Sequence, residues 1–251
     1  MKPWPERRKH EEMFEAYVTN PGLYPELGVE AGETLRFPTT TEEVRALFSR
    51  IGIDGERYGE YFITSYDSDV LGLYDCLDEY AGLDELNYLA HVLEEVQERG
   101  ELEKFEAAMA FGEHTDGAGD LINLAQNLDC YDFYPGIGDD EALGRYCVEE
   151  IGAIDIPEHI RDYFDYEAYG RDIDLNSTGS FVPGGYVLRN GEPFRECYAG
   201  REDIPEEYRI CGAPAQNEKE ETRSILETIR QFREAPPAPR KDREGPSHEG
   251  R

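Results

Sequence analysis

The sequence predicts an α+β protein built from three small domains and a C-terminal tail with one amphipathic helix. Three observations predict this class. Hydrophobic residues alternate in short segments near the start, recur at helical spacing in the middle, and show both patterns in the last third. The aromatic fraction is 12%, with 17 tyrosines, well above that of disordered acidic chains. A length of 251 residues suits one to three small domains.

The first predicted domain spans residues 13–66 and follows a flexible basic leader, residues 1–12. The segment FEAYVTN from Phe14 alternates hydrophobic and polar residues, which predicts a strand. GETLRF (32–37) and EYFITSY (60–66) predict two more strands. Thr40 and Glu43 have the spacing of a capping box, which predicts a helix that ends at Gly52. The domain is therefore expected to be a β-β-α-β unit.

The second predicted domain, residues 67–128, is helical. Apolar residues at spacings of three and four predict helices after Asp84, over residues 101–111, and after Asp120, which is expected to cap the third helix. Residues 54–106 hold sixteen acidic and three basic residues, so the exposed faces are expected to be almost uniformly negative. The spacing of Asp67, Asp69 and Gly72 resembles a calcium loop, but Leu71 stands where an oxygen ligand is needed.

The third predicted domain spans residues 129–212. DCYDFYPG predicts an acidic turn, Asp139-Asp140-Glu141 predicts the start of a helix that ends at Gly152, and Pro157 predicts a helix running to about Tyr169. SFVPGGYVLRNGEPFREC predicts a hairpin with a type I′ turn at Asn190-Gly191. Residues 143–174 hold nine carboxylates, while apolar residues there recur at helical spacing: Leu143, Tyr146, Cys147, Ile151, Ile160, Phe164 and Ala168. An acidic surface on a folded support is expected.

The tail, residues 213–251, is predicted to contain a linker, an amphipathic helix over residues 219–234 and a disordered end rich in proline and charge. A lone helix of this length is marginal in water. Its apolar side is therefore expected to bind a partner or to dock back on the chain.

The negative charge is confined to the predicted domains. Residues 11–212 contain 47 acidic and 13 basic residues, a net charge of −34, and Lys104 is their only lysine. Duplex DNA carries this charge over about 58 Å of its axis. Repulsion among so many negative charges destabilises the folded state, so we expect the charge to have a function. Adaptation to high salt is one alternative, but the tail holds eight residues of each sign and was not acidified. Nucleic acid is disfavoured as a partner because the domains have no basic patch.

The sequence offers no motif for catalysis, a cofactor or a metal. It has no GxxxxGK[ST], GxSxG or HExxH pattern and no clustered Cys or His spacing, so we expect a protein that is not an enzyme. A carboxylate-based glycoside hydrolase gains no support, because among 47 acids any spacing occurs by chance. The five scattered cysteines and the lack of a signal peptide or long apolar run predict reduced thiols, a cytoplasmic location and no membrane partner.

Several segments, in this order, resemble the ArdA-type antirestriction proteins. They are FEAYVTN, EYFITSY, LDEYAGLDELNYLA, DLINLAQNLDCYDFYP, LGRYCVEEIGAIDIPEHIRDYFDYEAYGRD and the final hairpin, together covering about residues 13–210. DYFDYEAYGRD is the most specific of them. The resemblance implies an elongated array of three small domains, a homodimer formed through the third, and carriage by conjugative plasmids and transposons. It also implies a mimic of B-form DNA that occupies the DNA-binding site of type I restriction–modification enzymes.

The resemblance places the antirestriction motif within the region matching residues 143–172. The expected phosphate-mimicking residues are Asp129, Asp132, Asp139, Asp140, Glu141, Glu149, Glu150, Asp155, Glu158, Asp162, Asp165, Glu167 and Asp172. Tyr163, Phe164 and Tyr166 are expected in the core or in a dimer contact, and Arg145, Arg161 and Arg171 are expected to pair with nearby acids. The alternative is a DNA mimic or acidic chaperone for another basic DNA-binding protein.

Overall fold

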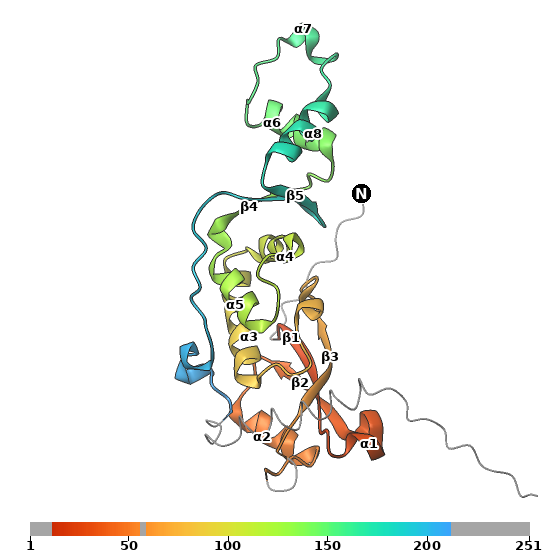
Figure 1. Ribbon diagram of the computed structural model, residues 1–251, viewed down its shortest axis with the longest axis vertical. Coiled ribbons are helices and arrows are strands. Elements are labelled where there is room, and N and C mark those ends of the chain that lie inside the picture. The colour runs from red at the N-terminus through yellow and green to blue at the C-terminus, as the bar shows by residue number, and fades with distance from the viewer. Residues whose placement is uncertain (1–11, 56–58, 212–251) are drawn as a thin grey trace, which may run out of the picture. The chain divides into compact units, whose positions relative to one another are not determined.

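The computed structural model describes residues 12–55 and 59–211 (Figure 1). The tail helix and the leader, apart from Glu12, lie outside the described residues. Over the described ranges the protein has two three-stranded antiparallel sheets and eight α-helices, which confirms the α+β class. No helix in these ranges is long and apolar enough to cross a membrane. All five cysteines are free thiols.

The first sheet has the strand order β2-β1-β3, with β1 (Phe14–Thr19) antiparallel to β2 (Gly32–Phe37) and β3 (Phe62–Ser68). The third strand begins two residues later than predicted. A short helix α1 (Tyr24–Leu27) follows β1, and α2 (Thr41–Arg50) connects β2 to β3. The predicted capping box at the start of α2 is confirmed: Glu43 N donates to Thr40 Oγ1 at 3.3 Å, and Thr40 N donates to Glu43 Oε2 at 3.0 Å.

The helices α3 (Leu83–Glu98), α4 (Leu102–Phe111) and α5 (Ala118–Gln126) occur where the apolar spacing predicted them. Their buried residues join those of the first sheet in one hydrophobic cluster. The prediction that Asp120 caps α5 is wrong, because the cap position is Gly117 and Asp120 lies in the first turn. There the Asp120 carboxylate accepts from the backbone N of Asp116, outside the helix.

The second sheet has the order β4-β6-β5 and supports α6 (Asp140–Glu149) and α8 (Tyr166–Asn176). The prediction of a turn at DCYDFYPG is wrong: Tyr131–Pro135 form β4, which pairs with β6 (Gly185–Arg189). The single helix predicted from Pro157 to Tyr169 is also wrong. It is split into α7 (Glu158–Arg161) and α8, because the Asp165 side chain accepts from the backbone N of Ala168 and starts a new helix.

The final hairpin exists, but its predicted turn is wrong. β5 (Gly179–Val182) and β6 are joined by Pro183 and Gly184, and Gly184 takes the positive φ of 93° that the turn requires. Asn190 instead ends β6: its backbone N donates to Cys130 O at 3.1 Å, and its side chain donates to Asp129 O at 2.8 Å. No strand follows β6 within residues 190–211, so Asn190-Gly191 does not connect two strands of a hairpin.

After β6 the chain continues as a C-terminal strap, residues 190–211, which contacts α5 and α3 (Figure 1). Asn123 of α5 accepts from the backbone N atoms of Cys197 and Tyr198 and donates to Tyr198 O, each at 2.8 Å. Asn127 contacts Arg195 in the same two-way manner. Asparagine matches one backbone donor and one acceptor at once, so these buried side chains stand in for a sheet partner.

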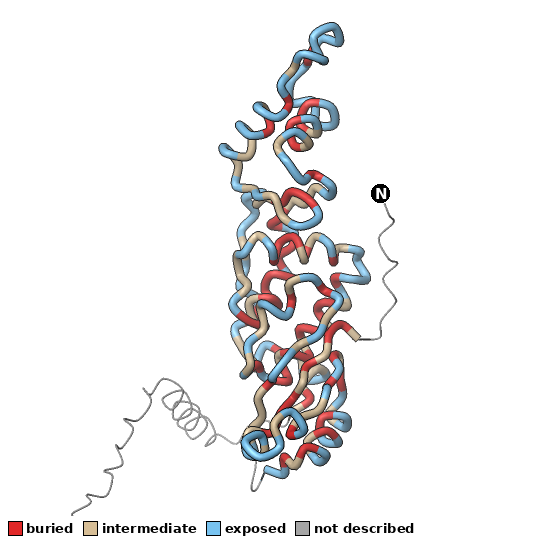
Figure 2. The backbone as a smooth tube through the Cα atoms, turned by 90° about the vertical axis from the view of Figure 1, so that its right-hand side faces the viewer, coloured by how far each residue is buried: buried red, intermediate tan, exposed pale blue. Residues whose placement is uncertain are grey.

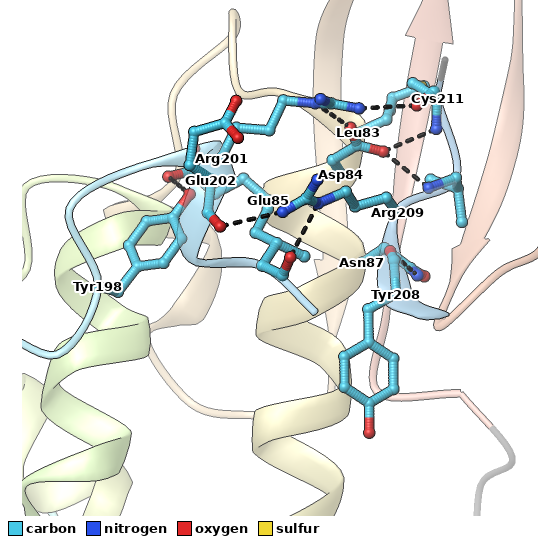
Figure 3. A network of polar contacts seen from close by, with 12 residues as sticks. Leu83, Asp84, Glu85, Asn87, Tyr198, Arg201, Glu202, Tyr208, Arg209 and Cys211 are labelled. Carbon is cyan, nitrogen blue, oxygen red and sulfur yellow. Dashed lines mark hydrogen bonds and ion pairs between the residues drawn. The ribbon is translucent and has the colours of Figure 1, made fainter. Parts of the chain in front are cut away.

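The end of the strap is fixed by the start of α3 (Figure 3). The Asp84 carboxylate, 7% exposed, accepts from the backbone N atoms of Ile210 and Cys211 at 2.7 Å and from Arg201 Nε at 2.6 Å. Arg201 also donates to Cys211 O at 2.9 Å. Burial raises the pKa of the Cys211 thiol to about 12, so the thiol stays protonated at neutral pH.

Candidate functional site: the acidic surface of α6 and α8

The predicted phosphate-mimicking acids lie on the surface. Eleven are exposed and two, Asp132 and Asp140, are half-buried; the exposed ones are Asp129, Asp139, Glu141, Glu149, Glu150, Asp155, Glu158, Asp162, Asp165, Glu167 and Asp172. Figure 2 shows the part of the chain around α6, α7 and α8 as mostly exposed. Residues 139–176 contain twelve acidic and three basic residues, a net charge of −9. We call this segment the acidic surface.

Two of these acids start the helices. Asp139 accepts from the backbone N of Ala142 at 2.8 Å and caps α6, and Asp165 accepts from the backbone N of Ala168 at 3.0 Å and caps α8. A carboxylate at this position also interacts favourably with the positive end of the helix dipole. Both charges therefore have fixed positions on the surface.

Two arginines hold four further acids. Arg145 donates to Glu141 at 2.8 Å and lies 3.8 Å from Glu149. Arg171 pairs with Glu167 on its own helix and with Asp140 on α6 at 3.2 Å. The pairing predicted for these two arginines is confirmed. Apart from the half-buried Asp140, these side chains are exposed to solvent. Ion pairs contribute little stability there, so the pairs mainly restrict where the carboxylates point.

Arg161 differs from the other two. No ion pair involves it within residues 12–55 and 59–211, and its predicted pairing stays a prediction.

Arg145 makes a second contact, in which its guanidinium lies over the Tyr166 ring, 4.4 Å from the centroid. Tyr166 in turn donates to Glu149 Oε1 at 3.2 Å. Tyr166 of α8 therefore contacts both Arg145 and Glu149 of α6 and connects the two helices.

The backbones of α6 and α8 touch at two glycines. A Cβ atom at Gly144 would overlap the carbonyl of Tyr166, with its carbon at 2.9 Å, and would lie 3.0 Å from Gly170 N. A Cβ atom at Gly170 would overlap the carbonyl of Asp140, with its carbon at 2.8 Å. Only glycine permits this approach. The contact fixes the separation of the two acid-bearing helices, and our sequence analysis did not predict it.

The segment between α6 and α8, residues 150–165, has acids without such anchors. Glu150, Asp155, Glu158 and Asp162 make no hydrogen bond or ion pair through their side chains within the described parts of the chain. Ile151 and Ile160 recur at helical spacing with the other apolar residues, but they are 57% and 45% exposed. Ile151 lies beyond the end of α6 at Glu149, and Ile160 lies on α7, a single turn that has no buried residue.

The three predicted aromatic residues have different surroundings. Tyr166 is 6% exposed and lies in a small core with Val148 and Ile156. Phe164 is half-buried and makes edge contacts with the rings of Tyr166 and Tyr169. Tyr163 is 87% exposed. Of the two predicted roles, Tyr166 and Phe164 have the contacts of core residues, and Tyr163 has the accessibility of a contact residue.

The acidic surface can bind cations and cationic side chains but has no arrangement for a chemical step. Within residues 12–55 and 59–211, no group of three or more His, Cys, Asp or Glu side chains is placed to hold a metal ion. What the surface offers is carboxylates at fixed positions. These can accept hydrogen bonds from arginine and lysine side chains that otherwise bind phosphates.

A comparison with curated proteins found no match to this chain. The model of the antirestriction protein family ArdA matches residues 16–188. This range covers more than half of the chain and includes nearly all of both sheets and all three helices of the acidic surface. The chain therefore belongs to the ArdA family of antirestriction proteins, non-enzymatic DNA mimics that inhibit type I restriction–modification enzymes.

Proposed function

We propose that the acidic surface of α6, α7 and α8 replaces DNA phosphates in the DNA-binding site of a type I restriction–modification enzyme. One observation supports this most strongly: the acids of α6 and α8 have fixed positions. Two of them cap the helices, others pair with arginine, and the backbones of the two helices touch at Gly144 and Gly170. The proposed contact residues are the thirteen predicted acids. Eleven lie on the acidic surface, including the unpaired carboxylates of residues 150–162, and Asp129 and Asp132 precede it.

Fixed geometry matters because binding orders the groups that take part. Immobilising a flexible side chain at an interface costs about 0.5–1.5 kcal/mol. Caps and arginine pairs have already restricted Asp139, Glu141, Asp165 and Glu167 before the enzyme arrives. A net charge of −34 over residues 11–212 attracts a basic channel from a distance and speeds association, and added salt weakens this attraction.

We further propose that the protein acts as a homodimer in the cytoplasm of a bacterial host. Tyr163, Ile151, Ile154 and Ile160 form an exposed apolar group on residues 151–163, and a second copy of the same group is its proposed partner. The resemblance to ArdA proteins supports dimer formation through the third domain, residues 129–212, which contains this segment. It also supports an elongated array of three domains, residues 13–66, 67–128 and 129–212, which we retain as part of the proposal.

Competition for the enzyme tests this function. A fluorescent DNA duplex is bound to a type I methyltransferase, and the protein and its variants are titrated in at physiological salt. A variant with Glu150→Gln, Asp155→Asn, Glu158→Gln and Asp162→Asn removes four unpaired charges without removing a cap or an ion pair. At about 0.6 kcal/mol per exposed charge, inhibition should weaken by roughly fifty-fold.

The matched control removes four exposed acids far along the sequence from the acidic surface: Glu26→Gln, Glu30→Gln, Glu42→Gln and Glu103→Gln. Both variants have the same net charge. If only nearby acids contact the enzyme, the control should inhibit within about two-fold of the wild type at physiological salt, where distant charges are screened. Equal losses in the two variants would show that total charge, and not this surface, determines inhibition.

A further inference from the structure

The acidic surface contains one short pattern twice. Residues 139–145 read DDEALGR and residues 165–171 read DYEAYGR, so both have the form D-x-E-A-x-G-R, 26 residues apart. Four of the seven positions have roles described above: the aspartate caps a helix, the glutamate and the arginine form an ion pair, and the glycine allows the close approach of the helices. The two copies lie 26 residues apart on different helices, so the periodicity of a single helix does not explain the repeat.

The repeated residues have the same role in both copies. The aspartate caps its helix by accepting from the backbone N of the alanine three residues later, at 2.8 Å in α6 and 3.0 Å in α8. The glutamate pairs with the arginine four residues later, Glu141 with Arg145 and Glu167 with Arg171. Sequence identity is thus accompanied by identity of local structure.

The contacts between the copies are reciprocal. Gly144 faces the carbonyl of Tyr166, and Gly170 faces the carbonyl of Asp140, which occupies the equivalent position in the other copy. Each arginine reaches across to that same position: Arg145 lies over the Tyr166 ring, and Arg171 pairs with Asp140. Each contact from the first copy to the second is thus matched by the equivalent contact from the second copy to the first. Reciprocal contacts of this kind are those made about a two-fold axis.

Both helices turn the same face toward the second sheet. Leu143 and Cys147 of α6 and their equivalents in α8, Tyr169 and Ile173, pack in one cluster with Tyr186 of β6. At 100° per residue, the glutamate two positions before Leu143 or Tyr169 lies on the opposite side of its helix. Glu141 and Glu167 are accordingly exposed, and they share the side of the pair that faces away from the sheet.

We infer that α6 and α8 form an approximate two-fold unit that presents two equivalent halves of its charge to one partner at the same time. This rests on the proposed function. The strands of B-form DNA run antiparallel and are related by two-fold axes. The partner is therefore a DNA-binding channel whose basic residues contact phosphates of both strands about such an axis, so that the two halves of the helix pair replace phosphates of opposite strands.

The test compares equivalent positions by competition with a DNA duplex for a type I methyltransferase at about 50 mM salt, where exposed charges are weakly screened. Glu141→Gln and Glu167→Gln should weaken binding by the same factor, about three-fold each. The double variant should weaken binding by the product of the two factors, about ten-fold, because both halves contact the enzyme at the same time. Glu103→Gln, an exposed acid on α4, is the charge control and should stay near the wild type.

Unequal single effects, with one variant near the wild type and the other three-fold or more weaker, would overturn the two-fold inference while leaving the proposed function intact. So would a double variant no weaker than either single variant. If the wild-type protein does not compete with DNA, the proposed function fails, and this inference fails with it. Circular dichroism and a melting curve of each variant establish that its fold is retained, since both side chains are exposed and glutamine preserves their length.

Discussion

The contact between Gly144 and Gly170 predicts that alanine at either position separates the two acid-bearing helices. At Gly144 the new methyl group would overlap the Tyr166 carbonyl, and at Gly170 that of Asp140. These obstacles are backbone atoms inside helices, which cannot rotate away as a side chain can. The helices must therefore move apart by roughly an ångström to reach ordinary van der Waals contact.

The expected cost follows from two opposing effects. Overpacking a tight contact costs about 1–3 kcal/mol, and a rigid backbone obstacle favours the upper end. Alanine in place of glycine within a helix returns about 1 kcal/mol. The net loss is about 2 kcal/mol for each variant, which corresponds to a fall in Tm of roughly 4–8 °C for a protein of this size. The double variant should lose much less than about 4 kcal/mol, because one separation of the helices relieves both overlaps.

Melting curves followed by circular dichroism measure this loss, and hydrogen exchange of the α6 and α8 amides locates it. Gly138→Ala is the matched control: the glycine lies two residues before α6, and no atom lies within 4 Å of its added Cβ. A Gly170→Ala variant as stable as Gly138→Ala would refute the close approach. Additive losses in the double variant would show that the two glycines do not share one contact.

Three further predictions concern other parts of the chain. Glu85 is half-buried and its pKa is raised by burial, so the folded state binds its proton more tightly than the unfolded state; Glu85→Gln should raise the free energy of unfolding at pH 7, with a gain that vanishes as the pH falls below about 4.5. Asp84→Ala removes the acceptor of Arg201 Nε and of two backbone N–H groups, and it leaves the Arg201 charge without its carboxylate. It should cost about 3 kcal/mol and expose the Cys211 thiol to alkylation, measured by peptide mass spectrometry, whereas Asp84→Asn should lose less. If the proposed homodimer forms, Tyr163→Ser should shift it toward monomer in sedimentation without lowering Tm, and a fully dimeric variant would exclude this residue from the interface.

Local signals in the sequence predicted the elements whose determinants are local. The capping box of Thr40 and Glu43 identified the start of α2, and alternation identified β1 and β2. β4 was missed because its partner β6 lies about fifty residues later, and tyrosines beside aspartate suit a turn as well as a strand. The strap was missed for a similar reason: Asn123 is an ordinary polar residue until the backbone of Tyr198 lies against it.

The acids of the candidate site could be identified from the sequence, but their arrangement could not. Composition and the DYFDYEAYGRD segment identified the region. Which acids are fixed depends on where helices start, and the break before Asp165 was not predicted. The contact of Gly144 with Gly170 joins residues from two helices, so no periodicity within either helix reveals it. The repeated D-x-E-A-x-G-R pattern is a signal in the sequence that could have indicated it, but it was not used in the prediction.

The most direct test of the proposed mimicry is the salt dependence of competition between the wild-type protein and a DNA duplex for a type I methyltransferase. If the acids occupy the phosphate site, the apparent inhibition constant rises in proportion to DNA concentration, and the intrinsic affinity falls by at least about ten-fold between roughly 50 and 200 mM salt. Inhibition that is unaffected by DNA concentration, or an affinity that stays constant over this salt range, would contradict the account.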